Sequence, residues 1–214
     1  MSTKVAQAVY QHRLAHSKVV YLADANLLVD SGPESEWAGL AEFLEGQDGV
    51  DRLFLSHAHG DHVGNAERVI EEYNPEVFIP ENESFDQIDL SEAAVTEVTD
   101  AGEVVDGVRA IEVPGHTEGI CALHLPQKEL LLCTDVLDGA DRRGLPAGFL
   151  LPPPAMYNWD SEAAETNLEK LLELSFDTAV VTHGTNVTED PRMKLEKYID
   201  FPNHYRQELL EELS

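Results

Sequence analysis

The chain has 214 residues, of which 43% are hydrophobic, so it is long enough to bury a full core, and we expect residues 1–214 to fold as a single domain. Its formal net charge of −27 repels phosphate backbones, so nucleic acid is not an expected partner. No apolar stretch is long enough to span a membrane, and no apolar signal-peptide core follows Met1. We therefore expect a cytoplasmic protein with no membrane partner.

The acidic residues are scattered along the chain rather than gathered in one tail, as at Glu71 and Glu72. Such a surface is compatible with high salt, because screening shortens the reach of like-charge repulsion. We therefore expect a halophilic source. Cys121 and Cys133 lie within apolar, strand-like runs and are expected to be buried thiols in a reducing compartment.

Apolar runs and periodicities in the first half of the chain alternate between strands and helices. The predicted strands are Val19–Leu22, Leu27–Val29, Asp51–Ser56 and Val77–Ile79. The predicted helices are Trp37–Leu44 and Asn65–Tyr73. The stretch from residue 81 to about residue 100 is acidic and carries no clear pattern.

A period of two dominates from Val104 onward and predicts sheet strands. The predicted strands are Val108–Val113, Ile120–Leu125, Leu130–Cys133 and Thr178–Thr182, and the predicted helices are Ser161–Leu174 and Pro191–Asp200. Residues 138–159, rich in Gly and Pro, form a long irregular connection of the kind that lines a site. Strand meanders with surrounding helices indicate a layered α+β fold.

A dense group of metal-binding residue types, His57-Ala58-His59-Gly60-Asp61-His62, follows the predicted strand Asp51–Ser56. Residues i and i+2 of an extended segment point to the same side, so His57 and His59 can hold one cation. Asp61 and His62, where the chain turns toward the next helix, can face a second. No cysteine occurs in the group, which argues against a closed structural zinc site and predicts an open, catalytic one.

Three further residues of these types follow predicted strands downstream. His116 stands in Pro-Gly-His-Thr-Glu-Gly, Asp135 ends Leu-Cys-Thr-Asp, and His183 stands in Val-Thr-His-Gly. Several strand ends therefore supply ligand-type side chains to what we expect to be one rim. The remaining histidines that have no motif around them are expected to have structural or surface roles: His12, His16, His124 and His204.

With these motifs in this order, the chain closely resembles the metallo-β-lactamase superfamily. The resemblance implies a four-layer αββα sandwich with the metal site at one edge of the β-sandwich. It implies two divalent ions and their ligands: His57, His59 and His116 for the first, Asp61, His62 and His183 for the second, and Asp135 as the bridge. Asp30, which ends a strand, would orient the site from behind these ligands. Imidazole and carboxylate donors suit zinc foremost, with iron or manganese as alternatives.

Two ions held close together would generate a metal-bridging hydroxide and stabilise a developing oxyanion, so we expect a hydrolase in which Asp61 and Asp135 are the catalytic carboxylates. No side chain is evident as a general acid, and a thiolate needs one least. The nearest group by resemblance is the glyoxalase II-like thioesterases. Few residues follow His183, so we expect the helical C-terminal extension of that group, and glutathione itself as the thiol, to be absent.

The expected substrate is a small-molecule thioester or ester. Arg142 and Arg143, an adjacent basic pair after Asp135, could hold a substrate carboxylate, and Tyr157 could shape the pocket or donate a proton. The alternative interpretation gives all three ordinary loop roles. The sequence does not indicate the oligomeric state.

Five alternatives are weighed against this pattern. A lactonase commonly has a tyrosine soon after the bridging aspartate, and Val136-Leu137-Asp138 offers none. A tRNA-processing phosphodiesterase needs a surface that attracts RNA, which the net charge disfavours. A persulfide dioxygenase uses a single iron, and a non-enzymatic binding protein would not need every ligand position filled. A true β-lactamase would be expected to carry an export signal.

Overall fold

The first sheet has seven strands, and the order in the sheet follows the order in the chain. The computed structural model describes the backbone of residues 2–212 and the side chains of residues 2–201. The strands are β1 (Ser2–Ala6), β2 (Val9–Arg13), β3 (Lys18–Leu22), β4 (Leu27–Val29), β5 (Arg52–Phe54), β6 (Glu76–Pro80) and β7 (Ala94–Val98). Strands β1 to β4 pair antiparallel, whereas β4 to β7 pair parallel.

The second sheet has five strands in the order β14-β11-β10-β9-β8. They are β8 (Glu103–Val105), β9 (Val108–Glu112), β10 (Cys121–Leu125), β11 (Leu130–Thr134) and β14 (Thr178–Val181). Strands β8 to β11 pair antiparallel, and β14 lies parallel to β11, so β9, β11 and β14 all end at the same edge. A short two-stranded ladder, β12 (Asp138–Gly139) with β13 (Leu150–Leu151), follows β11.

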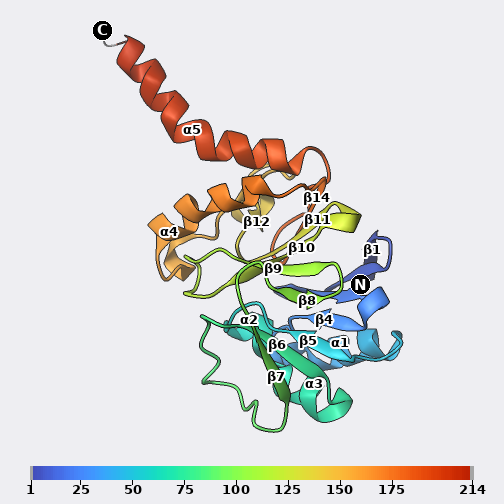
Figure 1. The fold of residues 1–214 in the computed structure, drawn as a ribbon. Coiled ribbons are helices and arrows are strands. Elements are labelled where there is room, and N and C mark those ends of the chain that lie inside the picture. The colour runs from blue at the N-terminus through green and yellow to red at the C-terminus, as the bar shows by residue number, and fades with distance from the viewer. Residues whose placement is uncertain (1, 213–214) are drawn as a thin grey trace.

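Helices cover the outer face of each sheet (Figure 1). They are α1 (Trp37–Glu45), α2 (Gly60–Val63), α3 (Ala66–Tyr73), α4 (Ser161–Thr166) and α5 (Pro191–Glu212), with a 3₁₀ segment at Asn167–Glu173. The far end of α5 extends away from the layered body. Within the described part of the chain, no helix is both long enough and apolar enough to cross a bilayer.

Alternating side chains of the strands build three separate hydrophobic cores. Phe54 and Leu123 belong to the core between the two sheets. Leu53, one residue from Phe54, packs instead with Phe43 and other residues of the helices on the first sheet's outer face. Leu168 belongs to the core on the second sheet's outer face. Period-two burial on both sheets therefore produces helix, sheet, sheet and helix layers.

The predicted four-layer αββα fold is confirmed, and every predicted strand is present. Three differences have physical reasons. Strands β1 and β7 were not predicted because most of their side chains are exposed and show no apolar alternation. The helix predicted for Ser161–Leu174 gives way to 3₁₀ geometry from Asn167. The predicted irregular connection 138–159 contains the β12–β13 ladder and 3₁₀ turns. That residues 1–214 form one domain stays a prediction.

Candidate metal centre

The polar side chains predicted as ligands meet at one edge of the sandwich. The segment after β5 carries His57 to His62 and leads into α2, while β9, β11 and β14 are followed by His116, Asp135 and His183. The two sheets are joined here by a backbone hydrogen bond from Cys121 N to Ser56 O at 3.2 Å. Both sheets therefore contribute residues to the same cluster.

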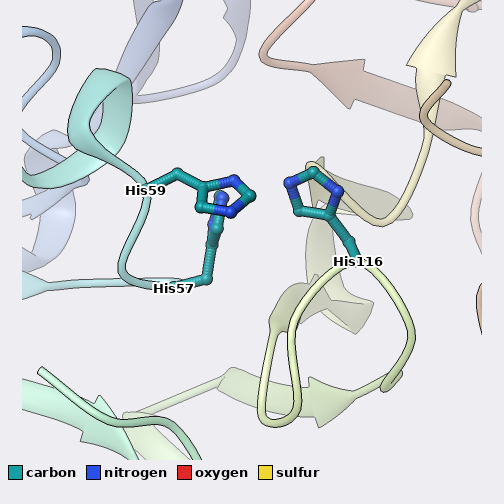
Figure 2. Close-up of side chains that lie close together, drawn as sticks. All are labelled: His57, His59 and His116. Carbon is teal, nitrogen blue, oxygen red and sulfur yellow. The ribbon is translucent and has the colours of Figure 1, made fainter. Parts of the chain in front are cut away.

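Three imidazoles form one half of this cluster, which we call the imidazole half: His57, His59 and His116. Figure 2 shows their rings facing one another, with His57 and His59 on one loop and His116 on another. Ring centroids lie 4.8 Å apart for His57 and His59, and 4.5 Å apart for His59 and His116. One ligand nitrogen from each ring lies within 4.8 Å of the others, which suits a shared cation.

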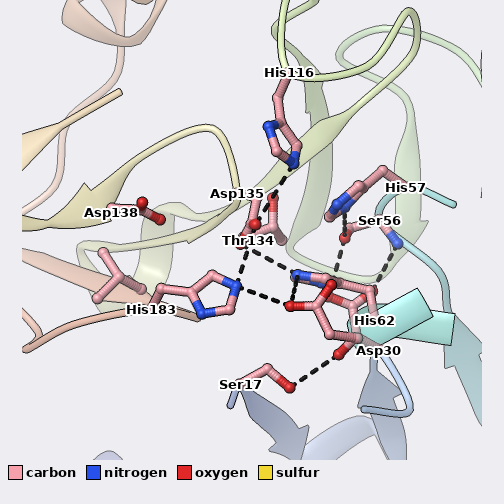
Figure 3. A network of polar contacts seen from close by, with 12 residues as sticks. Ser17, Asp30, Ser56, His57, His62, His116, Thr134, Asp135, Asp138 and His183 are labelled. Atoms are coloured by element: carbon pink, nitrogen blue, oxygen red, sulfur yellow. Dashed lines mark hydrogen bonds and ion pairs between the residues drawn. The ribbon is translucent and has the colours of Figure 1, made fainter. Parts of the chain in front are cut away.

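The other half, the carboxylate half, consists of Asp61, His62 and His183. His183 Nε2 lies 3.2 Å from Asp61 Oδ2, and His62 Nε2 lies 4.0 Å from the same oxygen. Asp135 lies between the halves: its Oδ1 is 3.2 Å from His62 Nε2, and its Oδ2 is 3.5 Å from His116 Nε2 (Figure 3). Its Oδ2 is also 3.2 Å from His183 Nε2.

Buried polar atoms that lack partners indicate whether the residues of the cluster can bind metal ions. The Nε2 atoms of His57, His62, His116 and His183 are buried without a hydrogen-bond partner among the described residues, and so is Asp135 Oδ1. Folded proteins rarely leave buried polar atoms unsatisfied, and each such atom costs free energy. Because these atoms converge and are all metal-donor types, the residues fit divalent ions.

Asp30 holds the cluster from behind. Its Oδ1 accepts a hydrogen bond from Ser56 N at 2.8 Å, its Oδ2 accepts one from Ser56 Oγ at 3.0 Å, and the same Oδ2 lies 2.7 Å from His62 Nδ1. Ser56 Oγ in turn lies 3.0 Å from His57 Nδ1. With Nδ1 occupied in this way, Nε2 of both rings is left to face the cluster.

Asp30 itself, and the residue before Asp135, have a left-handed backbone conformation. Asp30 has φ +60° and Thr134, the residue before Asp135, has φ +49°. A β-branched residue rarely adopts this conformation, which stores strain. Thr134 Oγ1 donates to Cys121 O at 2.9 Å and to Cys133 O at 2.7 Å, which stabilises the turn that presents Asp135.

Two orienting residues come from irregular segments and were not predicted. Asn158 Oδ1 lies 3.0 Å from His116 Nδ1. Glu83 accepts from Ala58 N at 3.0 Å through Oε1 and from Gly119 N at 2.9 Å through Oε2. Glu83 therefore ties the loop of His57 and His59 to the loop of His116. Neither residue stands in a periodic pattern or a motif, so no local sequence signal marks them.

The pKa values of the histidines differ between the two halves in the absence of ions. Burial and the neighbouring His62 hold the pKa of His57 well below its ordinary value, and burial lowers the pKa of His116 to about 4. Burial also opposes the charged form of His183, but the carboxylates of Asp135 and Asp61, each 3.2 Å from its Nε2, outweigh it and raise the pKa to about 9. In the same way, Asp135 and Asp30 overcome the effect of burial and raise the pKa of His62 well above its ordinary value.

The predicted substrate residues have partners within the protein. Arg142 Nη1 donates to the buried Asp138 Oδ2 at 2.7 Å, and its guanidinium lies 5.6 Å from the ring centroid of Tyr157. Arg143 donates to Pro152 O. Burial raises the pKa of Asp138 to about 6, and Asp135 adds to this effect. Tyr157 lines a pocket of about 300 Å³ together with His59 and His116. A substrate role for the two arginines stays a prediction.

Among the described side chains, the histidines without a motif lie outside the two halves of the cluster. His12 stacks on Phe43 at a centroid distance of 4.7 Å, and His124 Nε2 lies 2.9 Å from Ser175 O. His16 is exposed and borders a cleft of about 130 Å³ that His183 also lines. The side chain of His204 lies outside the described residues. Cys121 and Cys133 are buried free thiols, and burial raises the pKa of both.

Comparisons with known proteins agree with this architecture. A hydroxyacylglutathione hydrolase of Rhizobium meliloti (strain 1021) is 32% identical over 61% of this chain, and the match spans 46% of that protein. An uncharacterized protein of Bacillus subtilis (strain 168), YobT, is 25% identical over 73% of this chain and 77% of its own length. A metallo-beta-lactamase from Pontibacter korlensis superposes with a TM-score of 0.71 at 18% identity, covering 94% of this chain and 97% of its own.

The sandwich with ligand-type residues at one edge defines the class of fold. The family model described as the metallo-beta-lactamase superfamily matches residues 15–183, a range that includes the whole cluster and Asp30. The chain belongs to the metallo-beta-lactamase superfamily. The matched region spans only 46% of the hydroxyacylglutathione hydrolase, so membership of the superfamily does not establish the same activity for this chain.

Proposed function

We propose that this protein is a dinuclear metal-dependent hydrolase that acts on a thioester or ester. The observation that carries the proposal is the convergence of three overlapping ligand groups at one edge of the sandwich. His57 and His62 are each shared by two of these groups, and Asp135 belongs to the group between the two halves. Overlap of this kind is expected for two neighbouring cations rather than for one isolated ion.

The donor set suggests how two ions would be held. His57, His59 and His116 would hold one, and Asp61, His62 and His183 the other. Asp135, whose Oδ1 lies beside His62 and whose Oδ2 lies near both His116 and His183, would be shared between them. Zinc is the ion that this mixture of imidazole and carboxylate donors suits best. When bound, such ions supply an activated water and a Lewis acid for a carbonyl oxygen.

The chain's own residues fix the arrangement in advance of substrate binding. Asp30 orients His62 directly and His57 through Ser56, and Asn158 orients His116. Glu83 holds the two loops of the imidazole half at a fixed separation. Pre-organised ligands need not rearrange when charge develops on the reacting carbonyl, and this lowers the barrier.

A thioester is the favoured substrate because of its leaving group. Hydrolysis of a thioester adds water across the acyl–sulfur bond and releases a carboxylic acid and a thiol. A thiol has a pKa near 8.5, so it can leave as the thiolate without a protonating side chain. Similarity to a hydroxyacylglutathione hydrolase supports the same chemistry, although glutathione itself is not the proposed thiol.

The test combines metal analysis with turnover. Protein purified without chelators is expected to contain two ions per chain. It should hydrolyse a thioester faster than a lactone, a phosphodiester or a β-lactam. The same ranking of substrates is expected in dilute buffer and in molar salt. His12→Gln, which alters a histidine stacked on Phe43 away from the cluster, is the control and should retain both properties. One iron per chain with oxygen uptake, or no metal at all, would overturn the proposal.

A further inference from the structure

A group of exposed apolar side chains lies beside the imidazole half. Met156, Tyr157 and Trp159 are 81%, 50% and 62% exposed, and all three line the pocket of about 300 Å³ that reaches His59 and His116. We call these three side chains the apolar wall. Large apolar side chains that gather on a surface commonly mark a binding site.

The backbone of the apolar wall is fixed to the metal centre. Trp159 N donates to His116 O at 3.0 Å, and the intervening Asn158 side chain lies 3.0 Å from His116 Nδ1. Tyr157 N donates to Pro154 O at 2.9 Å, which closes a turn within the loop. The three side chains are therefore held at a defined position next to His116 while remaining open to solvent.

Two other residues that line this pocket carry negative charge. Glu83 and Glu118 line it, and no lysine or arginine does so among the described residues. Arg142 reaches the ring of Tyr157, but it is paired with the buried Asp138 at 2.7 Å, which offsets its charge. Apart from an ion held by the metal ligands, an anionic group in this pocket would meet two carboxylates and no unpaired basic side chain, so its desolvation would be poorly compensated.

We propose that this pocket binds an apolar acyl group with no negative charge, so that the substrates are thioesters or esters of neutral aliphatic or aromatic acids. This inference rests on the proposed function and specifies its substrate class. The apolar wall provides the surface that such an acyl chain covers, and burial of its methylene groups favours binding. The carboxylates discriminate against acyl chains that end in a carboxylate.

The test compares two thioesters of N-acetylcysteamine that differ only at the end of the acyl chain, hexanoyl and adipoyl. The wild-type protein, loaded with zinc, is expected to show a kcat/KM at least tenfold higher for hexanoyl. Trp159→Ala should raise KM several-fold for hexanoyl and much less for the acetyl thioester of N-acetylcysteamine, whose short acyl chain covers less of the apolar wall. Leu145→Ala is the matched control, because Leu145 is 50% exposed in the same long connection but does not line the pocket. Glu118→Lys should raise kcat/KM for adipoyl.

A binding measurement separates the inference from the proposed function. The ketone analogues of both thioesters, in which CH₂ replaces sulfur, are titrated calorimetrically into the zinc-loaded protein. Tighter binding of the hexanoyl ketone that is lost in Trp159→Ala supports the inference even if neither thioester is hydrolysed, in which case only the proposed function fails. Equal kcat/KM for the two thioesters, or equal effects of Trp159→Ala and Leu145→Ala, overturns the inference while leaving a thioesterase in place.

Discussion

The two halves of the cluster use the same loop in different surroundings. His57 and His59 face a second imidazole-bearing loop, whereas Asp61 and His62, only a few residues on, face His183 and carboxylates. Burial among other imidazoles keeps the pKa of His57 low, while Asp135 and Asp30 raise that of His62. Proximity in sequence therefore does not set the protonation state of a ligand. Burial lowers the pKa of both rings, and the two carboxylates beside His62 reverse the effect there.

The largest expected effect comes from removing one ligand from each half. His59→Ala and Asp61→Ala should each lower the metal content from two ions to one and abolish nearly all turnover, because the proposed reaction uses both ions. Metal content by atomic emission and kcat/KM for a thioester measure this. Undiminished kcat/KM in either variant would contradict the two-ion proposal, and His12→Gln serves as the control for both.

Intermediate effects are expected from the residues that orient each half. In the Asp61→Ala background, Glu83→Gln should weaken zinc binding at the imidazole half by about 10–100-fold, because one amide oxygen cannot accept from both Ala58 N and Gly119 N. Glu118→Gln is the control, since it changes the same pocket without touching these backbone groups. Competition with a fluorescent zinc chelator gives the dissociation constant.

Asp30→Asn is the counterpart for the carboxylate half. It removes a carboxylate oxygen that lies 2.7 Å from His62 Nδ1, so zinc affinity in the His59→Ala background should fall by a similar factor of about 10–100. The same chelator competition measures the loss. Because Asp30 reaches His57 only through Ser56, Asp30→Asn should weaken the imidazole half less. Equal losses at both halves, from Asp30→Asn or from Glu83→Gln, would contradict the division of the cluster into two halves oriented by different residues.

The smallest expected difference is the number of protons released on binding zinc at pH 7. The pKa of His183 is raised to about 9, so this ring is protonated at pH 7 and must lose its proton to bind an ion. Affinity at the carboxylate half should therefore rise as pH increases toward 9. The pKa of His116 is lowered to about 4, so that ring is already neutral and binding at the imidazole half should change little above pH 6.

Calorimetric titrations in buffers of different ionisation enthalpy count these protons. The His59→Ala variant retains the carboxylate half and should release about one proton or more, whereas Asp61→Ala retains the imidazole half and should release almost none. Equal proton release by the two variants would show that the protonation states of the two halves do not differ.

The sequence predicts most of the fold and the cluster because both leave local signals. Apolar strands such as Leu130–Cys133 end in a polar residue, and a ligand-type side chain after an apolar run is easily recognised. Among the strands it does not predict, which also include β2 and β8, β1 and β7 lie at the two ends of the first sheet and are held mainly by backbone pairing. Backbone pairing leaves no hydropathy pattern.

The residues that orient the ligands are less accessible to prediction. Asp30 is recognisable because it directly follows a predicted strand, and in the structure its carboxylate lies against His62 Nδ1. Glu83 and Asn158 act through contacts with residues more than thirty positions away, and their neighbours in sequence give no periodicity. Arg142 is a conspicuous basic residue whose substrate role stays a prediction, and its internal pairing with Asp138 is revealed only by the three-dimensional structure.

The placement of the cluster across both sheets has a mechanical consequence. An ion in the imidazole half joins the loop after β5 in the first sheet to the loop after β9 in the second, and an ion in the carboxylate half joins the same first-sheet loop to the segment after β14. Each ion would then be a cross-link between distant parts of the folded chain, and it would stabilise the fold because the unfolded chain offers no preformed site. Chelation should accordingly lower the unfolding temperature, and backbone amide exchange should rise first around His116 and His183, where the two sheets come apart.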